Sequence, residues 1–269
     1  MSDVVKEATT AIGVERHGEV TWLRLQRPAA MNAISTELLD ELNAALDGIE
    51  AGGDARVVVL TGSGRAFCAG ADLKALVASD GSVAPGDVVE FVGYAGRTIE
   101  RLAALPVPVI VGVNGLALAG GLELILACDI VVASSSARIG DAHANFGLVP
   151  GAGGSVRLPR AIGVQNAKYL ALTGAAFEPS SPIISGLVSE IVDPDDLERR
   201  LGEIATALGA KSPLGLSRMK SLINNAGDLS TADALAAEQS ALKDQCRSED
   251  FAEGISAFGA KRIPVYPGR

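Results

Sequence analysis

The sequence is poor in the residues that build disulfide frameworks and metal sites. It contains only three cysteines, Cys68, Cys128 and Cys246, and only two histidines, His17 and His143. The cysteines are far apart and form no C-x-x-C pair, which is typical of reduced thiols in a cytoplasmic protein. Two histidines exclude a histidine-rich metal site, so we expect no catalytic metal.

Basic charge is also scarce. The net charge is −9 and the isoelectric point is about 4.8, and no run of lysines or arginines occurs. Phosphate backbones bind proteins with clustered Lys and Arg, so nucleic acid is not an expected partner. A small charged ligand is still compatible with this composition, because backbone dipoles and one or two cations suffice to bind it.

Membrane and export signals are missing as well. Residues 102–122 carry no charge and are long enough to span a bilayer, but Pro106, Pro108 and several glycines interrupt them and Glu123 follows directly. A buried strand, a turn and a buried helix explain this stretch better, so we expect no membrane association. Residues 1–16 are acidic and polar without an apolar run, which predicts no signal peptide.

Common nucleotide-binding and nucleophile motifs are absent too. No Gly-Lys dipeptide occurs, which excludes a phosphate-binding G-x-x-x-x-G-K-[ST] loop. No G-x-G-x-x-G motif opens a helix after a strand, and G-x-S-x-G is absent. Cys68 could be considered as a nucleophile, but the sequence places no base beside it.

Hydrophobic spacing predicts an α/β protein. The expected strands cover residues 20–25, 56–60, 107–113, 130–133 and 188–192, and the expected helices cover residues 36–49, 87–105, 120–128, part of 150–160, and 164–172. Ser35 or Thr36 should cap the first helix and Gly52-Gly53 should end it. After residue 195 the pattern is almost entirely helical. We therefore predict an α/β core over residues 1–195, holding the active site, and a C-terminal helical region over residues 196–269.

Two glycine-containing turns each follow an expected buried strand. They are residues 65–74, RAFCAGADLK, and residues 114–123, NGLALAGGLE. Small residues let backbone N–H groups approach a ligand, and two such groups converging on one oxygen would form an oxyanion hole. Either turn alone is more typical of an ordinary strand-to-helix connection.

Glu123 is the most unusual residue of the second turn, because apolar residues surround it on both sides. Burial of a carboxylate favours its neutral form and suits proton transfer near neutral pH. Alternatively, backbone N–H groups satisfy the carboxylate and it is structural. The apolar pattern leaves both interpretations open.

Segments 66–74 and 114–123, Cys128-Asp129 and the PGAGG run at residues 150–154 look like the signature blocks of the crotonase (enoyl-CoA hydratase/isomerase) family. They occur in the expected order and at compatible spacings. Residues 27–33 and 248–262 resemble the opening and closing blocks of the family. The resemblance covers nearly the whole chain.

This resemblance implies a spiral core of repeated ββα units and a C-terminal helical trimerisation region. It implies a homotrimer or a dimer of trimers, an acyl-CoA thioester as the substrate, and no cofactor beyond the coenzyme A of that substrate. By position, the N–H groups of Ala71 and Gly120 would form the oxyanion hole for the thioester enolate.

The resemblance also implies contacts to coenzyme A. Ala69, Asp72 and Lys74 match positions near the adenine and the phosphates, whereas Phe258 and Lys261 match contacts made from a neighbouring subunit. Without the resemblance, Phe258 would be interpreted as a core aromatic, and the two lysines as solvated charges.

Glu123 matches the first of the two catalytic glutamates of the hydratases, but His143 occupies the position of the second. Imidazole acts as an acid or a base near neutral pH, so hydration through Glu123 and His143 is chemically feasible. Two alternatives are that His143 hydrogen-bonds another substrate group, and that it orients a loop through Asp141 or a carbonyl.

We therefore predict an enoyl-CoA hydratase-type lyase of fatty acid metabolism. The alternatives are an enoyl-CoA isomerase, an acyl-CoA or β-diketone hydrolase of the same superfamily, and a catalytically silent acyl-CoA-binding paralogue.

Overall fold

The computed structural model describes residues 10–52, 54–78 and 80–269. Two predictions fall partly outside these residues. They are the absence of a signal peptide in residues 1–16, and Gly53 of the expected helix stop.

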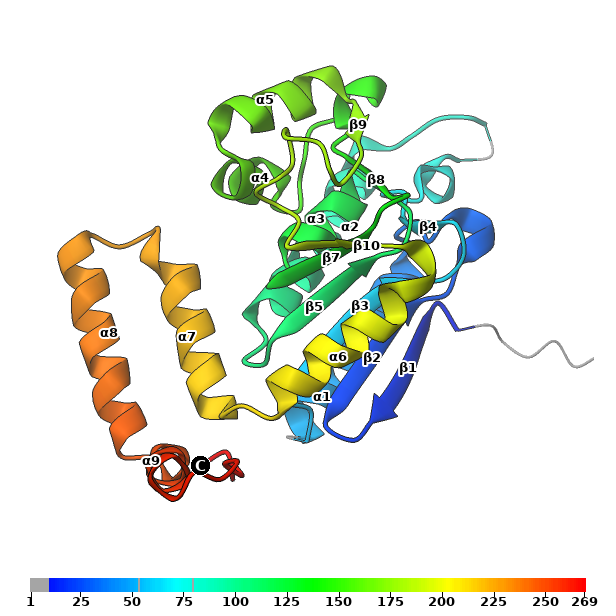
Figure 1. Cartoon of the computed structure of the whole chain (residues 1–269). Helices are drawn as coiled ribbons and strands as arrows, with labels where there is room; N and C mark the ends of the chain where they lie inside the picture. The colour runs from blue at the N-terminus through cyan, green and yellow to red at the C-terminus, as the bar shows by residue number, and fades with distance from the viewer. Residues whose placement is uncertain (1–9, 53, 79) are drawn as a thin grey trace, which may run out of the picture.

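Two sheets organise the core (Figure 1). The larger sheet has the order β1-β2-β3-β5-β7-β10, and its strands are Ile12–His17, Val20–Leu25, Val57–Gly62, Val109–Val113, Ile130–Ser134 and Glu190–Val192. The first two strands are antiparallel, and all later pairs are parallel.

A second, smaller sheet has the order β4-β6-β8-β9. Its strands are only two or three residues long: Ala66–Cys68, Leu116–Leu118, Arg138–Gly140 and Ala176–Phe177. Each of the first three follows a long strand of the larger sheet and precedes a helix. The repeated ββα spiral that we expected is therefore present. The sequence patterns alone had identified only strands of the larger sheet, and among these they had missed β1.

Helices follow these strand pairs and cover the sheets. They are α1 (Thr36–Gly52), α2 (Pro85–Ala104), α3 (Gly120–Leu126), α4 (Gly154–Ile162), α5 (Val164–Thr173) and α6 (Leu197–Gly209), with 3-10 turns η1 (Pro28–Ala30), η2 (Leu73–Leu76), η3 (His143–Phe146) and η4 (Pro194–Asp196). Ser35 caps α1 as predicted, because its hydroxyl oxygen accepts the Leu38 N–H at 3.2 Å. Residues 102–122 form the end of α2, then β5 and β6, then the start of α3. None of the helices among the described residues is long and apolar enough to cross a membrane.

The strand β3 shows how the core is divided between the two faces of the larger sheet. Val58 and Leu60 point into the main core, whereas Val57 and Val59 on the other face pack with Leu201 and its neighbours on α6. The predicted boundary at 195/196 assigns α6 to the helical region, but α6 packs on the sheet (Figure 1). The helices that stand apart from the sheets begin at α7.

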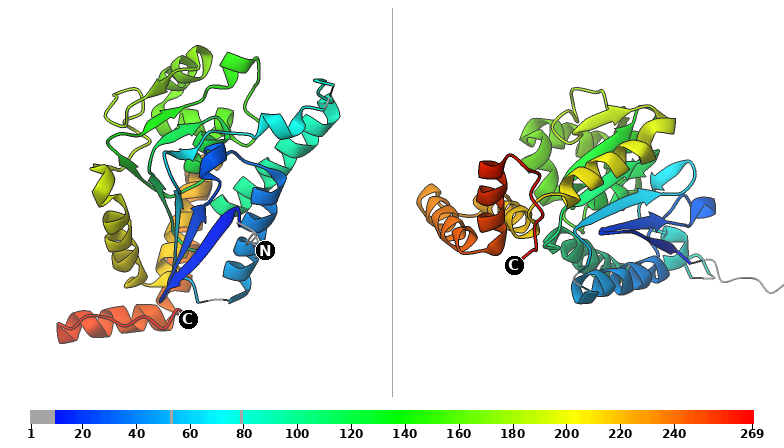
Figure 2. Two further views of the ribbon diagram at one scale, coloured as in Figure 1. Left: turned by 90° about the vertical axis from the view of Figure 1, so that its right-hand side faces the viewer. Right: turned by 60° about the horizontal axis from the view of Figure 1, so that its bottom comes forward.

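The tail consists of α7 (Pro213–Ala226), α8 (Thr231–Cys246), α9 (Glu249–Ala260) and the last residues of the chain. It projects from one side of the core, as Figure 1 and the right-hand view of Figure 2 show. Its attachment includes a largely buried ion pair: Lys220 Nζ of α7 lies 2.8 Å from Asp129 Oδ2 and donates to the Val107 carbonyl oxygen at 3.1 Å. Asp129 Oδ2 also accepts the Val109 N–H, so this aspartate joins the start of β5 to the tail.

Candidate active site

Two backbone amides lie side by side where the turn after β4 meets the start of α3. Ile34 N–H donates to the Gly70 carbonyl oxygen, and Asp72 N–H donates to the Ile34 carbonyl oxygen, both at 2.8 Å. Because the intervening peptide is trans, the Ala71 N–H must point away from Ile34. It lies beside Gly120: a Cβ placed on Gly120 would be only 3.8 Å from the Ala71 nitrogen.

Both amides are available to a ligand as far as the described residues are concerned. The N–H groups of Ala71 and Gly120 donate no hydrogen bond to any other described residue. Gly120 is the first residue of α3, where a helix has no internal acceptor for the N–H. The structure thus places the Ala71 and Gly120 amides close together, and their role as an oxyanion hole stays a prediction.

The backbone around Gly120 is strained and tightly packed. Ala119, just before α3, has φ 49° and ψ −113°, a backbone conformation that costs an alanine roughly 1–3 kcal/mol. Gly121 cannot be replaced without a shift, because a Cβ there would lie 2.1 Å from the Cys68 carbonyl oxygen. Such strain is concentrated at functional sites, where the surrounding structure holds it in place.

Glu123 lies on the first turn of α3 with only 4% of its surface exposed. Its Oε1 accepts the N–H groups of Ala152 at 2.8 Å and Gly154 at 2.9 Å, at the start of α4. These amides stabilise a negative charge, as the N-terminus of a helix does. The two donors were not predicted, although they lie in the PGAGG run that carried part of the family resemblance.

The second oxygen of Glu123 remains available. Among the described residues no group donates to Oε2 of Glu123, yet no buried side-chain oxygen or nitrogen there lacks a partner. Oε2 therefore faces accessible space. Both sequence interpretations of Glu123 are compatible with this geometry, since one oxygen is anchored and the other is free to exchange a proton.

His143 forms a close pair with Asp141. Its Nδ1 lies 2.9 Å from Asp141 Oδ1, and its backbone N–H donates to the same oxygen at 3.2 Å. The imidazole is 12% exposed and the carboxylate 2%. Burial lowers the pKa of His143, but the hydrogen bond to Asp141 and the charges of Asp141 and Glu123 together outweigh it, so the pKa is raised above its usual 6.5.

Asparagine side chains fasten the loops that carry these residues. Asn32 donates from Nδ2 to the Ser63 and Ala66 carbonyl oxygens, and Asn114 donates to the Gly64 carbonyl oxygen. Asn145, in the turn after His143, donates to the Gly174 carbonyl oxygen. These motif residues therefore hold the ends of β3, β5 and η3 in place.

The residues predicted to contact coenzyme A are dispersed. Ala69 N–H donates to the Met31 carbonyl oxygen, and Asp72 forms an ion pair with Arg27 at 2.9 Å. Lys74 on η2 is exposed. Phe258, on α9 of the tail, is 86% exposed, and Lys261 follows it at the end of the same helix. Phe258 is thus no core aromatic, and the coenzyme A contacts stay predictions.

The cysteines take no part in the site. Cys68 is fully buried on β4, and burial raises the pKa of its thiol to about 12, so it is a neutral packing group. Burial also raises the pKa of the Cys128 thiol. The described residues contain no group of three or more His, Cys, Asp or Glu side chains that could hold a metal ion.

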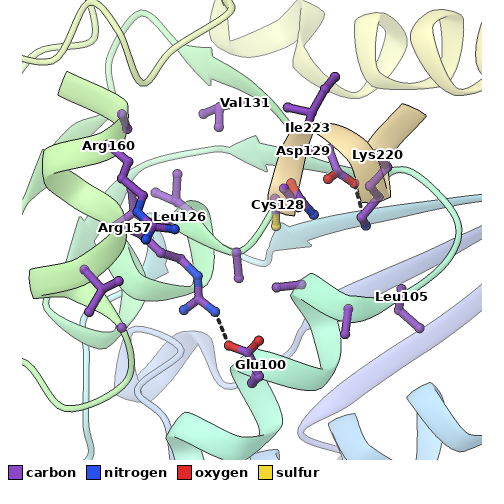
Figure 3. A pocket seen from close by; sticks show the side chains of 18 of the residues that line it. Glu100, Leu105, Leu126, Cys128, Asp129, Val131, Arg157, Arg160, Lys220 and Ile223 are labelled. Atoms are coloured by element: carbon purple, nitrogen blue, oxygen red, sulfur yellow. Dashed lines mark hydrogen bonds and ion pairs between the residues drawn. The ribbon is translucent and has the colours of Figure 1, made fainter. Parts of the chain in front are cut away.

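A separate cavity lies away from these amides. It has a volume of about 1040 Å³ and separates α7 from α2, α3 and α4 (Figure 3). Its charged side chains are paired with one another: Arg157 with Glu100, and Lys220 with Asp129. Neither Glu123 nor His143 lines it. We therefore locate the candidate site at the amides of Ala71 and Gly120 and not in this cavity.

Known proteins resemble this chain in both sequence and fold. The sequence model of the enoyl-CoA hydratase/isomerase family matches residues 15–269. A short-chain-enoyl-CoA hydratase of Clostridium acetobutylicum is 34% identical over 93% of this chain and 94% of its own. A 2,3-dehydroadipyl-CoA hydratase of Escherichia coli is 36% identical over 95% of this chain and 98% of its own.

Solved structures of enoyl-CoA hydratases also resemble this chain. The crystal structure of an enoyl-CoA hydratase from Bacillus anthracis superimposes with a TM-score of 0.91 at 37% identity, covering 96% of this chain and 100% of the other. The chain therefore belongs to the enoyl-CoA hydratase/isomerase family of the crotonase superfamily.

Proposed function

We propose that this protein is an enoyl-CoA hydratase that adds water across the α,β-double bond of an acyl-CoA thioester. The observation that carries the proposal is the pair of amides, Ala71 and Gly120, near a carboxylate oxygen, Glu123 Oε2. None of these three groups is hydrogen-bonded to another described residue. The names of the Clostridium and Escherichia relatives support the same reaction class.

The amides supply the electrostatic part of catalysis. The thioester carbonyl oxygen accepts from the N–H groups of Ala71 and Gly120, which makes the β-carbon electrophilic. Preorganised donors of this kind stabilise the developing enolate without reorganising during the reaction. Removing one such donor typically costs about 10²–10³ in kcat.

Glu123 and His143 carry the proton transfers. The Glu123 carboxylate takes a proton from water while the water oxygen bonds to the β-carbon, and the π electrons move into the enolate. The enolate then collapses as imidazolium Nε2–H of His143 delivers a proton to the α-carbon. The product gains OH at the β-carbon and H at the α-carbon, and the proton on Glu123 returns to His143 through solvent.

The protonation state of His143 suits this role. Hydration requires the imidazolium form, and although burial lowers the pKa of His143, its bond to Asp141 and the nearby negative charges raise it overall. The raised pKa keeps the acid form populated at higher pH than an ordinary histidine would.

The tail supports an oligomer. The tail, including the residues after α9, exposes apolar side chains that a monomer gains nothing by exposing, namely Met219, Ile223, Leu235, Leu242, Ile255, Phe258, Ile263 and Val265. We propose that they are covered in a homotrimer or a dimer of trimers, in which Phe258 and Lys261 reach the coenzyme A of a neighbouring subunit. Light scattering of the purified protein tests this, and a monomer at all concentrations would contradict it.

We further propose that Ala69, Asp72 and Lys74 contact coenzyme A within the subunit, and that the enzyme works in the cytoplasm without a cofactor of its own. Dialysis against a metal chelator should leave activity unchanged. Loss of activity that is restored by one metal ion would overturn the cofactor part of the proposal.

The direct test is an assay with trans-crotonyl-CoA. Loss of the ultraviolet absorbance of the conjugated thioester, with formation of 3-hydroxybutyryl-CoA, is the expected result. Faster conversion of a β,γ-enoyl-CoA would instead indicate an isomerase, and release of free thiol a hydrolase. Binding of acyl-CoA without turnover of any thioester would indicate a silent paralogue.

A further inference from the structure

One buried charged group next to the site has no part in the proposed reaction. Asp141 is only 2% exposed, and it directly precedes the turn that carries His143. A buried carboxylate is costly unless its oxygens are hydrogen-bonded, so its presence needs an explanation. Among the described residues, the groups that donate to Asp141 Oδ1 both belong to His143.

The geometry assigns the two ring nitrogens of His143 to different tasks. An ionised carboxylate can only accept hydrogen bonds, so the nitrogen beside it, Nδ1, must carry a proton. Nε2 makes no hydrogen bond to any other described residue. Because no buried polar side-chain atom in the described part of the chain is without a partner, Nε2 faces accessible space.

The backbone is bent to make this contact. Ala142, between the two residues, has φ 60° and ψ −7°, the left-handed conformation that alanine adopts at an energetic cost. The bend lets Asp141 Oδ1 reach both the backbone N–H and the ring of His143, two residues later. Asn145 Nδ2 donates to the Gly174 carbonyl oxygen and so fixes the same turn.

We propose that Asp141 is a positioning residue for the reaction: it holds the His143 ring with Nδ1–H bound to itself, so that Nε2 is presented to the α-carbon of the thioester. This inference rests on the proposed hydratase function, and it assigns a role to a residue outside the catalytic pair. It also explains how a histidine can replace a glutamate here. Only one of the two ring nitrogens of a histidine can face the substrate here, and the bond to Asp141 determines that it is Nε2.

The other charged groups near His143 do not compete for the ring. Glu123, from α3, raises the pKa of the imidazole through its charge. The helix α5 packs against η3, but its ionisable residues, Lys168 and Tyr169, are exposed and are not among the groups that shift the pKa of His143. Asp141 is therefore the group that binds the ring directly.

The chain offers an unusually clean test, because it contains only two histidines. In tag-free protein labelled with ¹⁵N-histidine, NMR resolves the protonation of each ring nitrogen. We expect neutral His143 to carry its proton on Nδ1 in the full-length wild type. Asp141→Asn, which is isosteric, should lower the pH at which His143 titrates. A neutral wild-type ring with its proton on Nε2, or an unchanged titration in the variant, would overturn the proposal.

Kinetics give the second readout. Asp141→Asn should reduce kcat for crotonyl-CoA by roughly 10- to 100-fold with little change in KM, less than the loss of the proton-transfer group itself. It should also move the high-pH limb of kcat/KM to lower pH, which a purely structural role would not do. An unmoved limb would contradict the proposal.

A matched control is available. Glu15 precedes His17 by the same two residues, so Glu15→Gln removes a carboxylate beside the other histidine. It should leave the His143 signals and the pH limb unchanged, and an equal shift from Glu15→Gln would refute a specific role for Asp141. The NMR result does not require turnover, so inactive wild-type protein with the expected ring protonation would disprove the hydratase function and not the ring geometry.

Discussion

The two histidines of this protein each lie near a carboxylate two residues earlier in the chain, yet the pairs differ in almost every physical respect. His17 Nε2 lies 3.4 Å from Glu15, and the two side chains are 63% and 51% exposed. His143 Nδ1 lies 2.9 Å from Asp141, and the side chains are 12% and 2% exposed. A histidine–carboxylate pair with the same spacing is therefore exposed in one place and buried in the other.

The cause lies in the backbone. His17 and Glu15 belong to the extended strand β1, where residues two apart point to the same face whatever their type. His143 and Asp141 meet only because Ala142 adopts a left-handed conformation between them. An exposed pair in high dielectric contributes little, whereas a buried pair determines which atom can carry a proton. Sequence spacing alone cannot distinguish these two cases.

Glu123→Gln should give the largest effect, because it removes the carboxylate that takes the proton from water. We expect kcat for crotonyl-CoA to fall roughly 10³–10⁴-fold, the upper range for a general acid–base group. The glutamine oxygen can still accept from Ala152 and Gly154, so the thermal midpoint should change little. Activity above a tenth of the wild type would contradict the role of Glu123.

His143→Gln and His17→Gln sharpen the comparison directly. The first should lower kcat/KM by roughly 10²–10³-fold, since one proton-transfer group is lost, and the second should have no measurable effect. Steady-state kinetics on both purified variants decide this. Similar losses in the two variants would show that His143 is not distinguished by its surroundings.

The pH dependence of kcat/KM should also distinguish the role of His143 from that of His17. Hydration needs the imidazolium form of His143, so kcat/KM should fall as pH rises through its pKa. Because the bond to Asp141 and the neighbouring charges raise that pKa above 6.5 despite burial, the fall should come at higher pH than for an ordinary histidine. His143→Gln should abolish this limb, and His17→Gln should leave it in place. A limb that persists in His143→Gln belongs to another group.

Ala142→Gly should give the smallest change. It relieves the left-handed strain and should raise the free energy of unfolding by about 1 kcal/mol or less, since glycine also increases the entropy of the unfolded chain. The looser turn should lower kcat only a few-fold. Denaturant unfolding together with kinetics tests both effects, and a destabilised variant would contradict the assigned strain.

The sequence predicted most helices and every strand of the larger sheet except β1, because their apolar patterns are clear. The strand β1 was missed, since only Ile12 of its six residues is buried. The short strands β4, β6, β8 and β9 were missed, since two or three residues show no period and their pairing is decided by the spiral itself. The family resemblance supplied the ββα arrangement that the patterns could not.

The sequence pointed to the residues of the candidate site, but it could not predict the hydrogen bonds between them. The AGGLE and PGAGG runs identified Glu123 and the segment that holds it, but not that Ala152 and Gly154 donate to one carboxylate oxygen. Similarly, Asp141 was only one of several ways to explain His143. Its bond depends on the conformation of Ala142, and an alanine in sequence gives no sign of a left-handed turn.

Hydration of trans-crotonyl-CoA in D₂O, analysed by mass spectrometry and NMR, tests the central claim most directly. The account predicts 3-hydroxybutyryl-CoA with one non-exchangeable deuterium on the α-carbon, formed by the wild type and slowed by both Glu123→Gln and His143→Gln. Absence of this product while the thioester is bound, or deuterium delivery unaffected by either substitution, would contradict it.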